Sequence, residues 1–398
     1  MNPESGQQTS FRFDRVEFAG ALGDLGTLLP IVVAMILING LSPSAVFLSF
    51  GLFYLFSAWH FRLPVPVQPL KAVGAIAIAS PLPITEPVIG ASGIIFGVIL
   101  LILALTGTVD RLARLFTPPV IRGIQLALGL VFLRKGVELI VQKNLFLGGE
   151  AGLFADHRAN LVLGIATFLL VLALLDNKKM PAALAALGVG IAAGIALGGH
   201  ASLKPSLGPT AIRMILPSAN DFWTAFTLLI LPQIPLTIGN ACVGTADMCR
   251  TLFPETPAFK KTSAGGFALT MGLVNLPVGF LGAIPMCHGT GGLAAHYRFG
   301  ARSGGAPLMI GAIFVAMALA FGEFWFTLLS VIPNAVLGVL LIFAGLELCP
   351  LVRSLTTNEE YFVALLISGI AMAVPNMAWA FGAGILVDLF LRRFSIKI

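Results

Sequence analysis

The stretch VPVQPLKA, residues 65–72, places two prolines, a glutamine and a lysine at the start of an apolar segment. Because proline lacks the N–H group that a helix interior needs, residues 64–67 are predicted to be extended and a helix to begin just after them. The first N–H groups of a helix have no partner within it and carry the positive end of its dipole. Lys71 lies one turn after Gln68 and adds a full positive charge. The stretch therefore predicts a binding site for an anion. The alternatives are that Lys71 snorkels toward the membrane interface and that Gln68 only satisfies backbone carbonyls freed by Pro66 and Pro69.

A second break of this kind occurs at GAIPMCHG, residues 282–289. Residues 283–286 are predicted to be extended, with Cys287, His288 and Gly289 at the start of a second short helix. The ring of His288 can donate to an anion or carry a proton, but a lone histidine is often a packing residue with satisfied hydrogen bonds. Gly289 and its neighbours Gly291 and Gly292 are costly in an ordinary helix and useful where the backbone approaches a ligand or another helix.

The composition is that of an integral membrane protein. Of the 398 residues 57% are hydrophobic and 11% are charged, and the mean hydropathy is +0.96. The sparse charge argues against a nucleic-acid partner. The four cysteines form no CxxC pair, which argues against a disulfide framework or a zinc site. We therefore expect a chain surrounded by the lipid bilayer, without cofactor or metal.

Breaks at proline, glycine and charge clusters divide the chain into fourteen apolar segments. They lie near residues 18–38, 43–60, 64–80, 88–108, 118–141, 158–175, 180–198, 221–250, 262–282, 285–297, 304–322, 328–349, 359–374 and 377–392. With both termini in the cytoplasm, the basic residues that fall outside are Arg134, Lys135, Lys143, Arg158, Lys204 and Arg213. This asymmetry follows the positive-inside rule. The sequence predicts a multi-pass protein of the inner or plasma membrane, with residues 1–17 retained as a cytoplasmic tail.

Seven segments in each half make an odd number, so two similar halves would be inserted in opposite senses. Residues 118–132 resemble residues 332–346, and the short third and tenth segments occupy matching places. We therefore predict an inverted repeat, with residues 18–198 as the first unit and residues 221–392 as the second. A matching pair of short segments interrupted by proline and glycine points to the binding site of a transporter.

Polar residues also occur in the first and eighth segments, within GALGDLGTLLP (20–30) and LPQIPLTIGNACVGTADM (231–248). The spacing of Gln233, Thr237 and Asn240 puts them on one helix face, which must contact protein or a cavity. A hydrogen-bonded seam between helices is the alternative to ligand binding. Asp24 must be paired or protonated in an apolar environment, so it is predicted to pair with a base such as Lys71 or to carry a coupling proton.

Four stretches resemble the molybdate-transporter branch of the SulP sulfate permease superfamily. They are GALGDLGTLLPI, PVPVQPLKA, PQIPLTIGNA and PMCHGTGGLAAHYRFGARSG. The resemblance implies an all-helical membrane protein of fourteen segments in a 7+7 inverted repeat, divided into a core domain (segments one to four and eight to eleven) and a gate domain (the others). It implies that the third and tenth segments are half-helices that hold the substrate between them. The chain stops at Ile398, so we expect no STAS regulatory domain.

The resemblance also implies the substrate and the site. The substrate would be a tetrahedral dianion, molybdate first, with sulfate and tungstate as relatives. The substrate-binding residues would be Gln68, Lys71, Gln233, Thr237, Asn240, Cys287, His288 and Gly289, and Asp24, Thr27 and Asp247 would support the site or couple transport to an ion.

Other functions compete with molybdate uptake. Sulfate or another oxyanion is the main alternative substrate, and an anion channel is the alternative mechanism. A carrier of a nucleobase or of bicarbonate, with the same inverted-repeat architecture, is a further alternative. A neutral nucleobase would need a carboxylate facing its ring N–H groups, whereas Lys71 offers donors. An enzyme is not expected, because the sequence has no HExxH or GxSxG motif and no paired Asp or Glu at helical spacing within the core segments. The oligomeric state stays open, with a homodimer among the alternatives.

Overall fold

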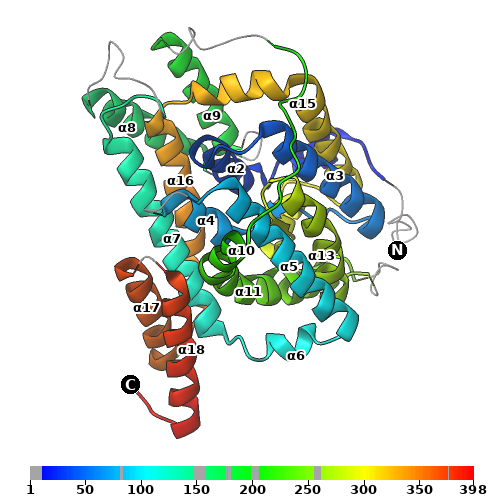
Figure 1. Cartoon of the computed structure of the whole chain (residues 1–398), viewed down its shortest axis with the longest axis vertical. Coiled ribbons are helices and arrows are strands. Elements are labelled where there is room, and N and C mark those ends of the chain that lie inside the picture. Colours follow the sequence, from blue (N-terminus) through cyan, green and yellow to red (C-terminus); the bar gives the residue numbers. More distant parts are fainter. Residues whose placement is uncertain are drawn as a thin grey trace, which may run out of the picture.

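The computed structural model describes residues 11–80, 84–147, 157–175, 177, 181–198, 206–254, 261–374 and 376–398. These residues are mostly helical, with two very short strands (Figure 1). The first half contains α1 (Arg15–Ala21), α2 (Leu25–Asn39), α3 (Pro43–Phe61), β1 (Gln68–Pro69), α4 (Lys71–Ala79), α5 (Glu86–Thr106), α6 (Val109–Ala113), α7 (Pro118–Val141), α8 (His157–Leu174) and α9 (Ala182–Ala196).

The second half begins with one long interrupted helix and ends with a helical pair. It contains α10 (Ala219–Thr224), η2 (Ala225–Ile230), α11 (Leu231–Leu236), η3 (Thr237–Gly244), α12 (Thr245–Leu252), α13 (Ala264–Phe280), β2 (Met286–Cys287), α14 (Thr290–Arg298), α15 (Gly305–Ser330), α16 (Asn334–Leu348), η5 (Cys349–Ser354), α17 (Asn358–Ala373) and α18 (Met377–Phe394). Helices α17 and α18 pack on each other and on α7, at the lower end of the view in Figure 1.

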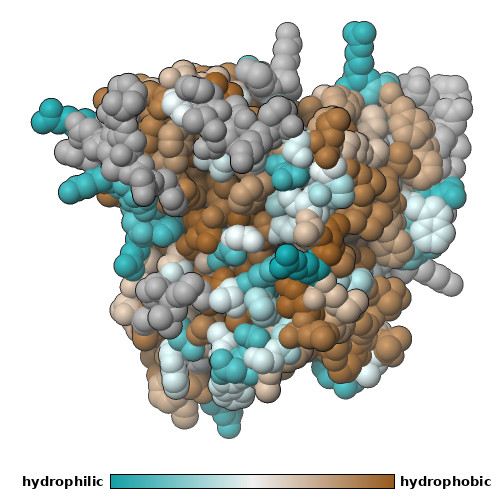
Figure 2. Space-filling model, turned by 45° about the horizontal axis from the view of Figure 1, so that its top comes forward, coloured by the Kyte–Doolittle hydropathy of each residue, from teal (hydrophilic) through white to brown (hydrophobic). Residues whose placement is uncertain are grey.

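The helices fit a protein that crosses the membrane several times. Five helical stretches in the described residues are long and apolar enough to span a bilayer, and α1 with α2, which meet at 44°, make a sixth. Hydrophobic residues cover broad areas of the face seen in Figure 2, and hydrophilic residues gather in patches between and around them. The chain is therefore a multi-pass membrane protein, while the count of fourteen segments stays a prediction.

The main packing pairs are reciprocal between the halves. Helix α3 packs on α15, α5 packs on α13, and α7 packs on α16. A side chain at Gly90 would come within 2.5 Å of the carbonyl oxygen of Gly279, and one at Gly345 within 2.6 Å of that of Gly129. Small residues of this kind allow two helix backbones to approach closely, which is how helices associate inside a membrane.

Both proline-containing breaks are non-helical, and they meet. Residues 62–70 and 281–289 lie outside helices, and β1 pairs with β2 in antiparallel fashion, with Gln68 opposite Cys287. The N–H of Leu70 also donates to the carbonyl of Pro285 over 2.9 Å. Each break is followed by a helix of 9 residues, α4 or α14. The starts of two short helices from opposite halves of the chain are thus brought together.

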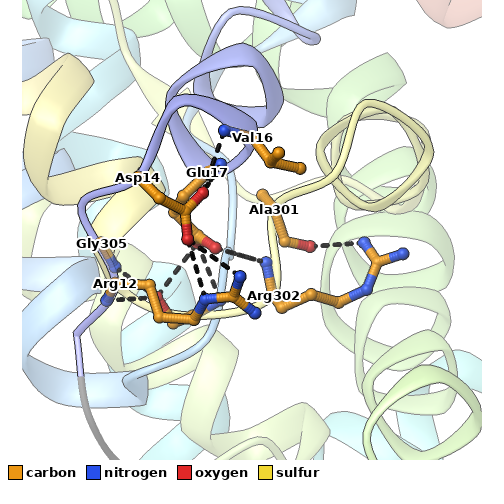
Figure 3. Close-up of polar contacts among 8 residues, drawn as sticks. Arg12, Asp14, Val16, Glu17, Ala301, Arg302 and Gly305 are labelled. Atoms are coloured by element: carbon orange, nitrogen blue, oxygen red, sulfur yellow. Dashed lines mark hydrogen bonds and ion pairs between the residues drawn. The ribbon is translucent and has the colours of Figure 1, made fainter.

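A cluster of polar contacts, here called the N-terminal clasp, connects α1 to the turn between α14 and α15 (Figure 3). The clasp consists of Arg12, Asp14, Glu17, Arg302 and Ser303. Asp14 caps α1 by accepting from the N–H groups of Val16 and Glu17, both at 2.9 Å. The N–H of Glu17 and the guanidinium of Arg12 lower the pKa of Asp14. The fully buried Glu17 accepts from the N–H groups of Arg302 and Ser303. The clasp thereby fixes α14 from its far end.

Candidate functional site

A cavity of about 990 Å³ lies where α2, α4, α7, η3, α14 and α16 meet. Its polar wall is formed by Thr27, Gln68, Lys71, Arg122, Gln125, Asn240, Thr290, Arg298 and Glu347. A second cavity of about 20 Å³ adjoins it and is lined by Gln68, Lys71, Gln125, Gln233, Asn240 and Cys287, among others. The small cavity has room for about one water molecule. Of these two cavities, only the large one has room for a polyatomic ion.

Lys71, the first residue of α4, faces both cavities and is partly exposed. Among the described residues no carboxylate oxygen lies within 4 Å of its ammonium nitrogen. The predicted ion pair with Asp24 is therefore not formed, although the two charges are near enough to interact electrostatically. The ammonium is left free to bind an anion in the cavity.

Asp24 is held by Gln68 instead of by Lys71. The Nε2 of Gln68 donates to Oδ1 of Asp24 over 2.6 Å, and both residues are almost fully buried. Oδ2 of Asp24 and Oε1 of Gln68 are buried and receive no hydrogen bond from the described residues. The pair thus leaves two oxygen acceptors without a donor among the described residues, one of them on Gln68, which lines both cavities.

At two of the three glycine positions at the start of α14, any larger residue would collide with the Gln68–Asp24 pair. A Cβ atom at Gly292 would lie 2.6 Å from Oδ2 of Asp24 and 2.8 Å from Nε2 of Gln68. A Cβ atom at Gly289 would collide with Oε1 of Gln68. Gly291, in contrast, lines the large cavity and has open space where its Cβ would be. The glycines allow α14 to pack directly on β1.

Gln233 and Thr237 support the start of α4 from behind. The Oε1 of Gln233 accepts from the N–H of Ala72 over 2.8 Å, and its Nε2 donates to the hydroxyl of Thr237 over 2.9 Å. This corrects the expectation that the first N–H groups of α4 point to a ligand, because at least one of them is capped by a side chain. The seam between helices, considered as the alternative for this face, is present at these two residues.

Asn240 belongs to both the seam and the cavity wall. It lies in η3, a π-helical stretch that follows Pro232 and Pro235, and such stretches occur often at functional sites. Thr290 of α14 donates to the side-chain oxygen of Asn240. This bond leaves the amide nitrogen of Asn240 available at the cavity. Cys287 is buried, lines the small cavity and lies opposite Gln68.

His288 is a packing residue in the structure. Its Nδ1 bonds to the carbonyl of Pro66 over 2.8 Å and its Nε2 to the hydroxyl of Thr270 over 3.2 Å. The ring is fully buried against Phe53 and Phe61 and does not line either cavity. With both ring nitrogens occupied by protein, His288 fixes the first break to the second.

Asp247 is not brought to the site. It lies on α12, where its exposed side chain pairs with Arg250 at 3.2 Å, and it lines neither cavity. Thr27 does lie in the large cavity, where its hydroxyl donates to the carboxylate of Glu347 over 2.8 Å.

Five polar residues of the cavity wall are not among those predicted from the sequence: Arg122, Gln125, Thr290, Arg298 and Glu347. Arg122 donates to Gln125 and to Ser354, both over 2.9 Å. Three of the five come from α7 and α16, which carry no predicted site residue. For Arg122, Arg298 and Glu347 the sequence signal is a charged residue within or at the end of an apolar segment, whereas the uncharged Gln125 and Thr290 give no such signal.

The sequence profile of a family described as "Molybdate transporter of MFS superfamily" matches residues 16–132 and 225–348. A curated relative from Arabidopsis thaliana, named Molybdate transporter 1, is 31% identical over 97% of this chain and 90% of its own length.

Two solved structures share the fold. The transmembrane domain of the cyanobacterial bicarbonate transporter BicA aligns with a TM-score of 0.65 and 15% identity, over 96% of this chain and 99% of that one. The murine Solute Carrier 26 family member A9, an anion transporter in its inward-facing state, aligns with a TM-score of 0.69 and 14% identity, over 98% of this chain and 70% of that one.

These matches confirm the resemblance indicated by the four sequence stretches. The profile covers more than half of the chain, and the plant relative is matched over nearly its whole length. The chain therefore belongs to the molybdate transporter family, and it has the fold of the SulP and Solute Carrier 26 transporters.

Proposed function

We propose that the protein is a secondary active transporter that imports a tetrahedral oxyanion, molybdate first, across the cell membrane. The observation that carries this proposal is the ammonium group of Lys71, which faces a 990 Å³ cavity without a carboxylate partner among the described residues. A charged group inside a membrane protein needs a counter-ion, and here the substrate supplies it. The name of the plant relative supports molybdate as that substrate.

The oxyanion is proposed to bind between Lys71 and the first turn of α14. Four oxygen atoms that accept hydrogen bonds would meet the ammonium of Lys71, the amide nitrogen of Asn240 and the N–H groups at the start of α14. Gln68, Gln233, Thr237, Cys287 and Gly289 would shape this site from behind. Asp24 would hold Gln68 in place through their 2.6 Å bond.

We propose the finer architecture on the same basis. Helices α4 and α14 would be half-helices that end inside the membrane, in an inverted repeat of seven segments over residues 18–198 and seven over residues 221–392. The reciprocal packing of α3 on α15 and of α5 on α13 supports this, because a two-fold axis relating the halves would produce such a pattern. The core would carry both half-helices, and the gate would contain α7 and α16.

The cavity is proposed to open to the cytoplasm. Its lining includes Pro118, Leu175, Pro181, Arg298 and Leu351, which lie at helix ends that the positive-inside rule assigns to the inside. A separate cavity of about 410 Å³ lies toward the other ends of α4 and α7, next to Arg134 and Lys135. We propose that movement of the core against the gate connects the substrate site to these two sides in turn.

Binding and counterflow experiments test the proposal. Purified protein should bind molybdate in a calorimetric titration, and the same titration with tungstate and sulfate ranks the substrates. In liposomes preloaded with unlabelled molybdate, uptake of labelled molybdate should saturate and be accelerated by the internal anion. Tighter binding of sulfate than of molybdate would favour the alternative substrate, and uptake that neither saturates nor shows counterflow would favour a channel.

A further inference from the structure

Glu347 is an acidic group in the wall of the cavity that the transport proposal does not use. It lies in the last turn of α16, and its side chain is exposed to the cavity. Its Oε2 accepts a hydrogen bond of 2.8 Å from the hydroxyl of Thr27, which belongs to α2. The bond connects two residues that are 320 positions apart in the sequence and that lie on two different helices. In the proposed architecture it joins the gate to the core.

Four charged residues on other elements share the cavity with Glu347 or interact with it. Lys71 on α4 and Asp24 at the start of α2 are near enough to interact with it electrostatically. Arg122 on α7 and Arg298 on α14 line the same cavity. Among the described residues no cationic nitrogen lies within 4 Å of the carboxylate. Glu347 is thus a carboxylate without an ion-pair partner that shares a cavity with Lys71.

A bound dianion changes the charge balance of this cavity. The oxyanion competes with Glu347 for the positive field of Lys71, and two like charges in a partly dry space repel each other. A proton on Glu347 removes that repulsion and turns the carboxyl group into a donor for an oxyanion oxygen. The proton comes from the buffered solution to which the cavity is proposed to open, and it adds to one carboxylate oxygen of Glu347, so the conjugate base stays in solution and no other reactant is needed.

We propose that Glu347 takes up a proton when the oxyanion binds, and that loss of this proton promotes release of the oxyanion to the side on which the cavity opens. This inference rests on the proposed function, because it assigns a proton-binding residue to the same site. Glu347 is a better position for the proton than Asp24, because Asp24 is 1% exposed and already bonded to Gln68, whereas the side chain of Glu347 is exposed in the wall of the large cavity.

Calorimetric titration of molybdate in buffers of different ionisation enthalpy measures proton uptake directly. The wild-type protein should take up about one proton per molybdate, and its affinity should fall about tenfold for each pH unit over which free Glu347 is ionised. Glu347→Gln should take up almost no proton, and its affinity should change little over the same pH range. Glu323→Gln, a carboxylate bonded to Ser206 that does not line the cavity, is the matched control and should behave as the wild type.

Asp24→Asn assigns the proton independently, even if Glu347→Gln fails to fold. Asparagine retains the oxygen that accepts from Gln68, and this variant should still take up about one proton. Loss of proton uptake in Asp24→Asn would overturn the assignment to Glu347. Binding of molybdate by the wild type without proton uptake would overturn the inference and leave the transport proposal intact. Failure of the wild type to bind any oxyanion would overturn both.

Discussion

Gln68 donates a hydrogen bond of 2.6 Å to Asp24, and Gly292 of α14 packs directly on this pair. The pair lies at the junction of three elements: Asp24 precedes α2, Gln68 belongs to β1, and Gly292 lies in the first turn of α14. Its geometry therefore sets the distance between the two short helices whose starts enclose the proposed anion site.

Gly292→Ala should destabilise the contact between α14 and the Gln68–Asp24 pair. Gly291→Ala adds a methyl group to the cavity only, so it should leave that contact and the unfolding temperature unchanged. The new methyl group at position 292 would lie 2.6 Å from Asp24 and 2.8 Å from Gln68, whereas a methyl group at position 291 meets nothing within 4 Å. Forced overpacking costs about 1 to 3 kcal/mol in a well-packed core. Thermal unfolding and molybdate titration of the two variants provide the comparison. Equal losses in both would show that the contact between α14 and the Gln68–Asp24 pair is unimportant.

His288→Ala should lower stability more than it changes the intrinsic affinity for the anion. The substitution leaves the buried carbonyl of Pro66 and the hydroxyl of Thr270 without their partner, at a cost of about 1 to 3 kcal/mol. His288→Asn keeps one donor near Pro66 and should recover part of the loss. The unfolding temperature is the measurement. A stable His288→Ala protein with strongly weakened molybdate binding would return His288 to the list of ligands.

Neutralising the cationic wall of the 410 Å³ cavity should slow uptake without changing binding at the proposed cytoplasmic cavity. Glu138 lines the same cavity and pairs with Lys135 at 2.9 Å, so it offsets part of the positive charge. The positive charge that remains raises the local concentration of an anion. Arg134→Gln combined with Lys135→Gln should reduce uptake at low molybdate by roughly 3- to 10-fold at low salt, and less at high salt. Lys143→Gln, exposed and outside this cavity, is the control. An unchanged uptake rate at low salt would remove this cavity from the transport path.

The two breaks and Lys71 could be predicted because they follow from local chemistry. Proline at positions 66, 69 and 285 removes N–H donors, so each helix begins after these prolines. This holds whatever the position of the segment in the fold. Lys71 stands out in an apolar chain by its charge alone. Neither inference needs a partner that is distant in sequence.

The roles of His288, Gln233 and Glu347 could not be predicted because their partners come from other segments. His288 binds Pro66, Gln233 binds the N–H of Ala72, and Glu347 binds Thr27. In the sequence Glu347 is an acidic residue near the end of an apolar run, which is also what an acidic residue at the membrane surface looks like. Only the packing of α16 on α2 shows that Glu347 faces the cavity and is not an acidic residue at the membrane surface.

The central claim is that Lys71 binds the transported oxyanion. Calorimetric titration of molybdate tests this claim most directly, in the wild-type protein, in Lys71→Ala and Lys71→Arg, and in the control Lys261→Ala. Lys261 is exposed and lies outside the cavity. Removing one partner from a buried charge pair costs about 2 to 5 kcal/mol, roughly a 30-fold to several-thousand-fold rise in Kd. Lys71→Arg should recover only part of this, because the planar guanidinium fits poorly in a space filled by a compact ammonium. We expect Lys71→Ala to remain folded by thermal unfolding and to lose molybdate affinity to this extent, while Lys261→Ala keeps it. A well-folded Lys71→Ala protein with unchanged affinity would contradict the account.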